Sequence, residues 1–168
     1  MNKVLMFLVL ILLPFYGMNA QQNKNIKIGG FGLEVPKALS SLSKTEREQK
    51  YAIQGQIPDE VYQTKNDDVN ISYMSTFVPI EEAKFPVLKN NLEKQFTNPN
   101  SEILQSDIIE LDGKKFVLTK VMLKVNNILM TNLVTEKQGK MVMLIISHST
   151  NRVNYFKENE QIMNSLTL

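Results

Sequence analysis

The second half of the chain contains four consecutive segments that are typical of β-strands and are joined by very short connections. The segments are Glu102 to Leu111, Lys115 to Val125, Ile128 to Glu136 and Met141 to Ser147. The pair Asp112-Gly113 in the first connection is a strong signal for a tight hairpin turn. Because connections this short join antiparallel neighbours, the sequence predicts a four-stranded antiparallel meander.

The last of these strands places the strongest constraint on the architecture. Met141 to Ile146 is apolar at every position, so both of its faces must be covered. Two predicted helices can supply the cover: Glu81 to Phe96, whose regular part starts near Phe85, and Arg152 to Leu166. We therefore expect an α+β fold, a three-layer α/β/α sandwich with a central, mainly antiparallel sheet and helices on both faces.

The first half of the chain predicts fewer and shorter elements. Phe31 to Val35 alternates and ends at Pro36, which predicts a strand. Ser43 followed by Glu46 has the spacing of a capping box, which predicts a short, exposed helix. Further predicted strands are Val61 to Thr64 and Val69 to Phe77, which form a hairpin across residues 65–68, and a short terminal strand at Leu166 to Leu168.

The first twenty residues have the layout of a secretory signal peptide. A basic start at Lys3 precedes an apolar run from Val4 to Tyr16, and Ala20 is a small residue at the expected cut. The alternative is an uncleaved anchor, although the run is shorter than the roughly 20 apolar residues that a spanning helix needs. We expect a signal peptide at 1–20, an N-terminal lead at 21–30 and a single domain at 31–168. The mature protein is then periplasmic or extracellular, with no stable membrane insertion.

Composition excludes several classes of function. With 19 basic and 17 acidic residues, the formal charge is only +2, and the basic residues are scattered, which gives no basis for nucleic-acid binding. The absence of cysteine excludes disulfides, thiol catalysis, cysteine metal sites and the lipid anchor of a bacterial lipoprotein.

The order of these elements resembles the PsbP-like superfamily, which includes the photosystem II subunit PsbP, Ran-binding Mog and the bacterial DcrB-type envelope proteins. The resemblance rests on the first hairpin, the helix, the Asp112-Gly113-Lys114 turn, the apolar strand and the final helix ending in Ile162 to Leu166. It covers Phe31 to the C-terminus and implies an α/β/α sandwich. Members are mostly accessory, assembly or partner-binding proteins without catalysis, and no family binding motif transfers to this chain.

The sole histidine, His148, is the first candidate for chemistry. Its neighbours Ser147 and Ser149 point to the opposite face of a strand, so neither can join it in a catalytic triad. We interpret His148 as a strand-end residue in or beside the core. Asn66, Asp68 and Asn70 have the alternate spacing of a calcium loop, but the required glycine and distal glutamate are missing, which favours a solvated turn.

Three further groups of residues receive structural interpretations. The methionines of the mature chain are typical of core filling rather than of a Cu(I) site. The carboxylate pairs at 59–60, 81–82 and 158/160 are typical of helix starts and solvated faces. Lysines at 114, 115, 120 and 124 fall in one hairpin, where they predict a sheet edge defended against self-pairing, with a binding surface as the alternative.

The sequence thus predicts no catalytic, cofactor-binding or metal-binding residue. We expect an exported, non-enzymatic binding or accessory protein whose partner is another protein. The expected partner surface lies in the segment from 40 to 59 and includes Glu46, Arg47, Glu48 and Asp59, because packing accounts least for this segment. Two alternatives remain open: an immunity-type protein that neutralises a protein toxin, and an envelope hydrolase with a carboxylate site.

Overall fold

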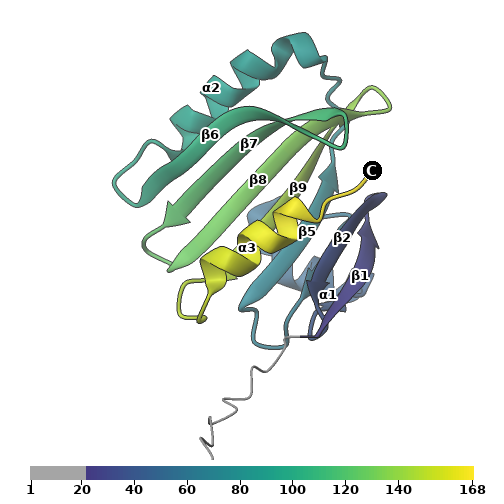
Figure 1. Cartoon of the computed structure of the whole chain (residues 1–168), viewed down its shortest axis with the longest axis vertical. Coiled ribbons are helices and arrows are strands. Elements are labelled where there is room, and N and C mark those ends of the chain that lie inside the picture. The colour runs from purple at the N-terminus through teal and green to yellow at the C-terminus, as the bar shows by residue number, and fades with distance from the viewer. Residues whose placement is uncertain (1–21) are drawn as a thin grey trace, which may run out of the picture.

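The structure, a computed structural model, describes residues 22–168 (Figure 1). The described chain is a mixed α+β protein with three α-helices and a large antiparallel sheet. The elements of its first half are β1 (Asn23–Ile28), β2 (Phe31–Pro36), β3 (Ser40–Ser41), α1 (Lys44–Tyr51), η1 (Ala52–Gln54), β4 (Glu60–Gln63), β5 (Val69–Ser75), η2 (Glu82–Lys84) and α2 (Phe85–Phe96). Those of its second half are β6 (Ser101–Leu111), β7 (Lys114–Leu123), β8 (Ile128–Lys137), β9 (Lys140–Ser149) and α3 (Tyr155–Asn164).

Seven strands form the large sheet in the order β3-β4-β5-β9-β8-β7-β6, and all neighbours in it are antiparallel. The predicted meander from β6 to β9 and the β4–β5 hairpin are confirmed. Asp112 and Gly113 turn the chain between β6 and β7 with φ values of 50° and 72°, the left-handed conformation that such a tight turn requires. Strand β9 returns to pair with β5, which joins the two groups of strands into one sheet.

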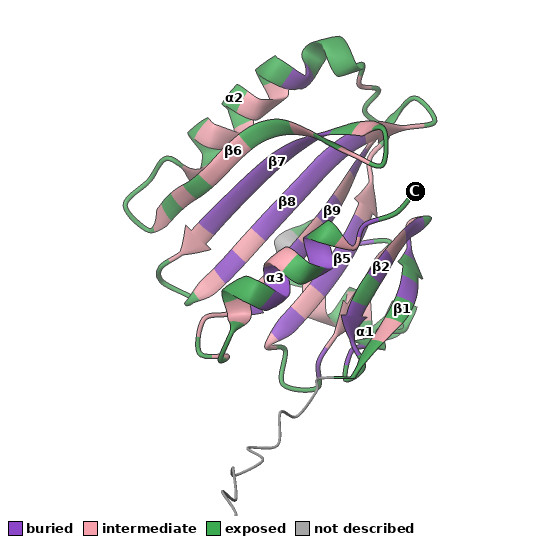
Figure 2. Ribbon diagram, viewed as in Figure 1, coloured by how far each residue is buried: buried purple, intermediate pink, exposed green. Residues whose placement is uncertain are grey.

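One face of the sheet carries the main hydrophobic core (Figure 2). Val142, Leu144 and Ile146 of β9 alternate toward this face, as expected for a strand. Ile162 and Met163 of α3 pack on them, and the two-stranded sheet of β1 and β2 lies on the same side, beside α3 (Figure 1). This face is thus closed jointly by a helix and a hairpin.

The intervening residues of the strands point to the opposite face. There Val117 of β7 and Val134 of β8 are buried against Phe85 of α2, and Met141 and Met143 of β9 pack at the margin of that cluster. Helix α2 contacts β6 and β7. The apolar strand β9 therefore has packed side chains on both of its faces, as its sequence predicts.

Most helix boundaries follow local signals in the sequence. The capping box of Ser43 and Glu46 is present at the start of α1, and α2 begins at Phe85 with Pro86 in its first turn, as predicted. The final helix is shorter than the predicted 152–166. Asn154 precedes it with a φ of 64°, a left-handed value that interrupts helical continuation from residue 152.

Both ends of the described chain belong to the packed structure. Residues 23–28, which the sequence analysis assigned to an N-terminal lead, form strand β1 and pair with β2. At the other end, the predicted terminal strand is reduced to a single bridge between Gly32 and Thr167. The predicted signal peptide lies outside the described residues. Within residues 22–168, no helix is long and apolar enough to cross a membrane.

Candidate functional site

Two of the predicted partner-surface residues take part in the local structure of α1. The backbone N–H of Ser43 donates to Glu46 Oε2 at 2.7 Å, and the N–H of Glu46 donates to Ser43 Oγ at 3.3 Å. These hydrogen bonds hold the pKa of the Glu46 carboxyl below its ordinary value. Arg47 Nη1 donates to the carbonyl of Leu42 at 3.0 Å. Both side chains therefore stabilise the start of the helix that carries them.

The other two predicted residues also have intramolecular partners. Glu48 lies 3.7 Å from Lys44 in an exposed pair one turn apart on α1, and such pairs contribute little to stability. Asp59, in the connection before β4, accepts a hydrogen bond from the N–H of Ser75 at 2.7 Å. The structure thus places three of the four residues on α1 and the fourth in a loop; their role in partner binding stays a prediction.

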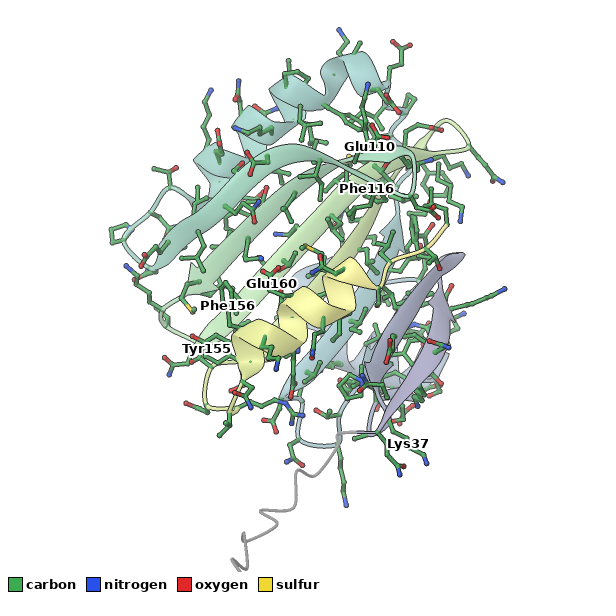
Figure 3. The ribbon with its side chains drawn as sticks, viewed as in Figure 1. Lys37, Glu110, Phe116, Tyr155, Phe156 and Glu160 are labelled. Carbon is green, nitrogen blue, oxygen red and sulfur yellow. The ribbon has the colours of Figure 1, made fainter. Side chains whose placement is uncertain are left out.

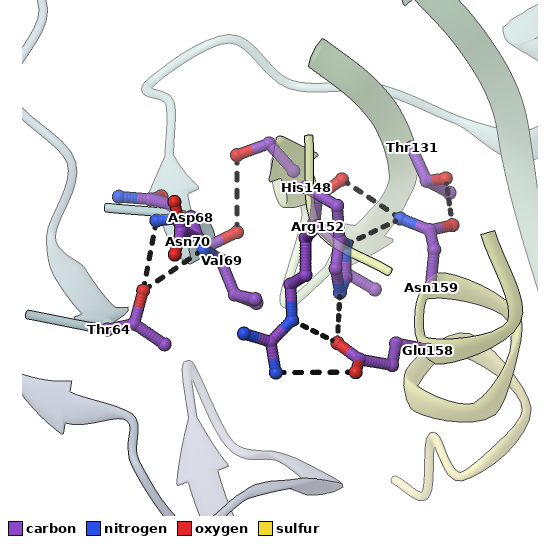
Figure 4. Close-up of polar contacts among 11 residues, drawn as sticks. Thr64, Asp68, Val69, Asn70, Thr131, His148, Arg152, Glu158 and Asn159 are labelled. Carbon is purple, nitrogen blue, oxygen red and sulfur yellow. Dashed lines mark hydrogen bonds and ion pairs between the residues drawn. The ribbon is translucent and has the colours of Figure 1, made fainter. Parts of the chain in front are cut away.

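His148 lies in a polar cluster between α3 and the sheet (Figure 4). It is 1 % exposed at the end of β9, so its interpretation as a core-side residue is confirmed. Thr131 Oγ1 donates to Asn159 Oδ1 at 2.6 Å, which turns the Asn159 amide nitrogen toward His148 Nδ1 at 3.3 Å. Nδ1 is then the acceptor, so the imidazole proton is on Nε2 and faces Glu158 Oε2 at 3.7 Å.

The electrostatics of this cluster keep the imidazole neutral. Burial and, to a smaller extent, the positive charge of Arg152 together lower the pKa of His148 from 6.5 to about 4. Arg152 Nε donates to Glu158 Oε2 at 2.7 Å, so the carboxylate that faces the ring is held by the arginine. The side chain of His148 is 0 % exposed, which leaves a substrate no access to it. We conclude that this cluster fastens α3 to β8 and β9.

The prediction that the lysines of the hairpin between β6 and β7 mark an edge of the sheet is wrong. Strand β7, which carries or adjoins all four lysines, lies between β8 and β6, so the free edge is β6. Lys120 is only 2 % exposed, pairs with Glu160 of α3 and lies 5.2 Å from the centre of the Phe156 ring (Figure 3). The remaining lysines, at 114, 115 and 124, each form an ion pair with a glutamate of β8, η2 or β6.

The face of the sheet opposite α3 also carries apolar side chains between the attachments of α1 and α2, and one of them, Met143, packs against the Phe85 cluster. These side chains are half-buried: Met74 of β5, Met130 of β8, and Met143 and Ile145 of β9. Met74 stands directly opposite Met143 across the β5–β9 pair. We call these four residues the open face. Helix α2 packs beyond it on β6 and β7, and hydrogen bonds attach α1 at its other side.

The attachment of α1 is visible in two hydrogen bonds. Asn70 Nδ2 of β5 donates to the hydroxyl of Tyr51 at 3.1 Å, and Lys50 Nζ donates to Gln63 Oε1 of β4 at 2.5 Å. Asn70 and Gln63 are partners across β4 and β5 and lie on the same face of the sheet as Met74. Helices α1 and α2 therefore flank the open face from opposite sides.

Two buried polar side chains lie in the same cross-strand row as the centre of the open face. Thr119 of β7, Asn132 of β8 and Ile145 of β9 are consecutive partners in register. Asn132 is 6 % exposed, and its Nδ2 atom has no hydrogen-bond partner in residues 22–168; the same holds for Thr119 Oγ1. Such groups are few in folded proteins, because burying a donor unpaired costs about 1–3 kcal/mol.

Exposed apolar residues border the open face where β5 ends. Phe77 is 92 % exposed, and Val78 beside it is also exposed. The N–H of Thr76 donates to the carbonyl of Met141 at 2.9 Å, and the N–H of Met141 donates to Val78 at 3.0 Å, which holds this loop against β9. The Lys140 ammonium lies 5.5 Å from the centre of the Phe77 ring. These backbone hydrogen bonds place the exposed loop of Phe77 and Val78 beside the start of β9.

Sequence reasoning missed this surface because it assigned each methionine to the core. The one available signal was Met74, a large apolar side chain among Asn70, Ser72 and Thr76 on the polar side of β5. For the other candidates, the described residues contain no group of three acidic, histidine or cysteine side chains arranged to hold a metal ion. Asn66 and Asp68 bond to each other in the β4–β5 turn, at 3.4 Å.

No family model matches the sequence, and a search of curated proteins finds no match. Solved structures do match. Cyanobacterial PsbP (CyanoP) from Synechocystis aligns with a TM-score of 0.55 and 14% identity over 90% of this chain and 95% of its own. The chain has the PsbP-like fold. LpqN of Mycobacterium tuberculosis, described as involved in cell envelope biogenesis, aligns with a TM-score of 0.55 and 15% identity over 87% of this chain and 90% of its own.

A third structure, the Ran-binding protein Mog1p of Saccharomyces cerevisiae, aligns less closely, with a TM-score of 0.45 and 12% identity over 88% of this chain and 96% of its own. The matches to CyanoP and LpqN confirm, at the level of fold, the resemblance inferred from the sequence. Identities near 15% extend no activity, partner or site residue from these proteins to this chain.

Proposed function

We propose that the protein is an exported, non-enzymatic binding or accessory protein that docks another protein on its open face. The observation that carries the proposal is the half-buried apolar set of Met74, Met130, Met143 and Ile145, together with the exposed Phe77 in the loop after β5. Contiguous exposed apolar surface of this kind marks interaction sites in soluble proteins. Methionine suits such a surface because its flexible thioether side chain adapts to a partner's shape.

Three further features belong to the proposal. We interpret the fold as a three-layer α/β/α sandwich, supported by apolar clusters on both faces of the sheet, one with α3 and the other with α2. Export is supported by the apolar run from Val4 to Tyr16 and by the likeness in fold to LpqN. The predicted surface of Glu46, Arg47, Glu48 and Asp59 lies on and after α1, so it forms one rim of the docking region.

The proposal is tested by affinity capture of the tagged mature protein from the envelope and culture medium of its own host. The test variant Ile145→Lys places a charge on the open face, and the control Val153→Lys places the same charge at an 80 % exposed position next to α3. We expect one dominant partner with the wild type and the control, and loss of that partner with Ile145→Lys at unchanged thermal stability.

Two results would contradict the proposal. A wild-type protein that captures no stoichiometric partner would refute the binding function. Equal capture by Ile145→Lys and the wild type would show that the open face is not the docking surface. A combined substitution of Glu46, Arg47 and Glu48 tests the rim separately: a loss of capture here, with Ile145→Lys unaffected, would move the docking surface to α1.

A further inference from the structure

A polar groove runs between the β1–β2 hairpin and the C-terminal end of α3, which lie side by side in Figure 1. Two adjoining cavities of about 600 Å³ and 370 Å³ form it, and both are lined by Glu34 of β2 and by Ser165 after α3. These volumes fall in the range of small-molecule sites, about 300–1,000 Å³. We propose that the groove binds an oligosaccharide without net charge, a function separate from protein docking on the open face.

Hydrogen bonds fix the floor of the groove, because they fasten the end of the chain along β2. The N–H of Gly32 donates to the carbonyl of Thr167 at 2.9 Å, and the N–H of Thr167 donates to the carbonyl of Gly32 at 3.0 Å. The N–H of Glu34 donates to Ser165 Oγ at 2.8 Å. A Cβ at position 32 would lie 2.4 Å from Thr167 Oγ1, so this close approach requires glycine. A site that is held in this way loses little conformational entropy when a ligand binds.

Both walls of the groove present polar side chains whose hydrogen-bonding groups are not used within the protein. Asn25 and Lys27 stand two residues apart on one face of β1, and Gln161 and Asn164 belong to the last turn of α3. None of these four side chains forms a hydrogen bond or an ion pair with another of residues 22–168. A side-chain amide both donates and accepts, as a sugar hydroxyl does, so each amide can pair with a hydroxyl in either sense.

The charges of the lining favour a ligand without net charge. Among the residues that line the two cavities, the charged side chains are Lys27 and Glu34, one of each sign. An anionic ligand would be repelled by Glu34 and a cationic one by Lys27, whereas a hydroxyl can donate to the carboxylate or accept from the ammonium. Ile26 and Leu33 also line the larger cavity, where they offer apolar atoms to the C–H face of a sugar ring.

The groove suits a saccharide better than an extended peptide. A peptide strand that joins a sheet is recognised mainly through unpaired backbone groups at the sheet edge. On the groove side of β2, the backbone of Gly32 is already paired with Thr167, so the groove offers side-chain groups instead. Because the two cavities share Glu34 and Ser165, we expect the ligand to have at least two linked sugar rings, one for each cavity.

The test is a titration of the tagged mature protein, labelled with nitrogen-15, with cellotriose and with triacetylchitotriose, which are both neutral trisaccharides. The side-chain amide NMR signals of Asn25, Gln161 and Asn164 report on the groove. The signal of Asn126, which is exposed in the turn between β7 and β8, is the internal control. Trigalacturonate serves as the charged comparison and trialanine as the peptide comparison.

We expect saturable shifts of the three groove signals with at least one of the neutral trisaccharides and no shift at Asn126. Asn25→Ala and Asn164→Ala, one from each wall, should each weaken binding about fivefold, which corresponds to the loss of one hydrogen bond. Asn126→Ala removes the same kind of side chain outside the groove and should leave binding unchanged, as should Ile145→Lys on the open face.

Three results would overturn the inference. The first is no shift of the groove signals at about 10 mM of either trisaccharide, a concentration that nearly saturates even a site with a Kd of about 1 mM. The second is equal or tighter binding of trigalacturonate or trialanine. The third is unchanged affinity in both Asn25→Ala and Asn164→Ala. Each of these leaves the docking function standing, since partner capture is tested with Ile145→Lys on the opposite face of the sheet.

Discussion

Lowering the pH from 7 to 4 should destabilise the protein through its single histidine. His148 is enclosed between β9 and α3, where burial, and then the charge of Arg152, lower its pKa from 6.5 to about 4. The carboxylate of Glu158, 3.7 Å away, would favour the protonated ring, but that carboxylate is bonded to Arg152. Between pH 6.5 and about 4, protonation of His148 is therefore confined to the unfolded or locally opened chain.

The sign and size of the effect follow from linkage between protonation and folding. Above pH 6.5 the ring is neutral in both the folded and unfolded chain, so it contributes no pH dependence. As the pH falls below 6.5, the unfolded chain takes up a proton that the folded chain rejects, and stability decreases until pH 4, where the folded protein also titrates. The interval from 6.5 to about 4 corresponds to a loss of about 3 kcal/mol.

Urea denaturation of the wild type and His148→Gln between pH 7 and 4 isolates this contribution, because the carboxylates titrate in both proteins and cancel. Glutamine keeps an acceptor for Asn159 and carries no titrating group. We expect the wild type to lose about 3 kcal/mol more than the variant. Parallel curves, or a histidine NMR titration of the folded wild type with a midpoint near 6.5, would refute the reasoning.

Three substitutions, two of them with a matched control, test other parts of the fold by chemical denaturation at pH 7. Ser43→Ala removes the capping box of α1 and should cost about 1 kcal/mol, with no change expected in circular dichroism beyond that helix. Phe85→Ala, at the buried first position of α2, should cost about 3–5 kcal/mol, whereas Phe77→Ala at its exposed position should stay within about 0.5 kcal/mol. Gly29→Ala places a Cβ 2.2 Å from a tyrosine ring, so it should cost clearly more than Gly139→Ala, which has a similar positive φ but open space around it.

The parts of the fold that the sequence predicts correctly depend on few adjacent residues. The turn at Asp112-Gly113 needs left-handed backbone at two positions, and the start of α1 needs a hydroxyl and a carboxylate three residues apart. The helix from Phe85 follows from a proline that is tolerated only in a first turn. Such signals involve only a few neighbouring residues, so they can be interpreted without knowing which distant segments pack around them.

The order of the strands has no comparable local signal. Pairing of β5 with β9 joins residues such as Ile71 and Ile146 that are far apart in the chain, and nothing near either one specifies the other. The lysine hairpin was assigned to an edge for this reason, although Lys120 lies at an interior strand and is neutralised by Glu160 from α3. The open face was missed likewise, since the exposure of Met143 depends on where α1 and α2 attach.

Two buried asparagines, Asn159 and Asn132, allow a polar side chain that stabilises the fold to be distinguished from one that serves binding. Asn159, 0 % exposed, bonds to Thr131, to the carbonyl of Ile146 and to His148, so Asn159→Leu should cost about 2 kcal/mol or more by leaving these groups unpaired. Asn132 has an amide nitrogen without a partner in residues 22–168, so Asn132→Leu should leave stability unchanged or raise it by about 1 kcal/mol. If Asn132 contributes to docking on the open face, the same substitution should weaken partner capture, a stabilising change with a functional cost. Equal destabilisation by both variants would show that Asn132 is as structural as Asn159.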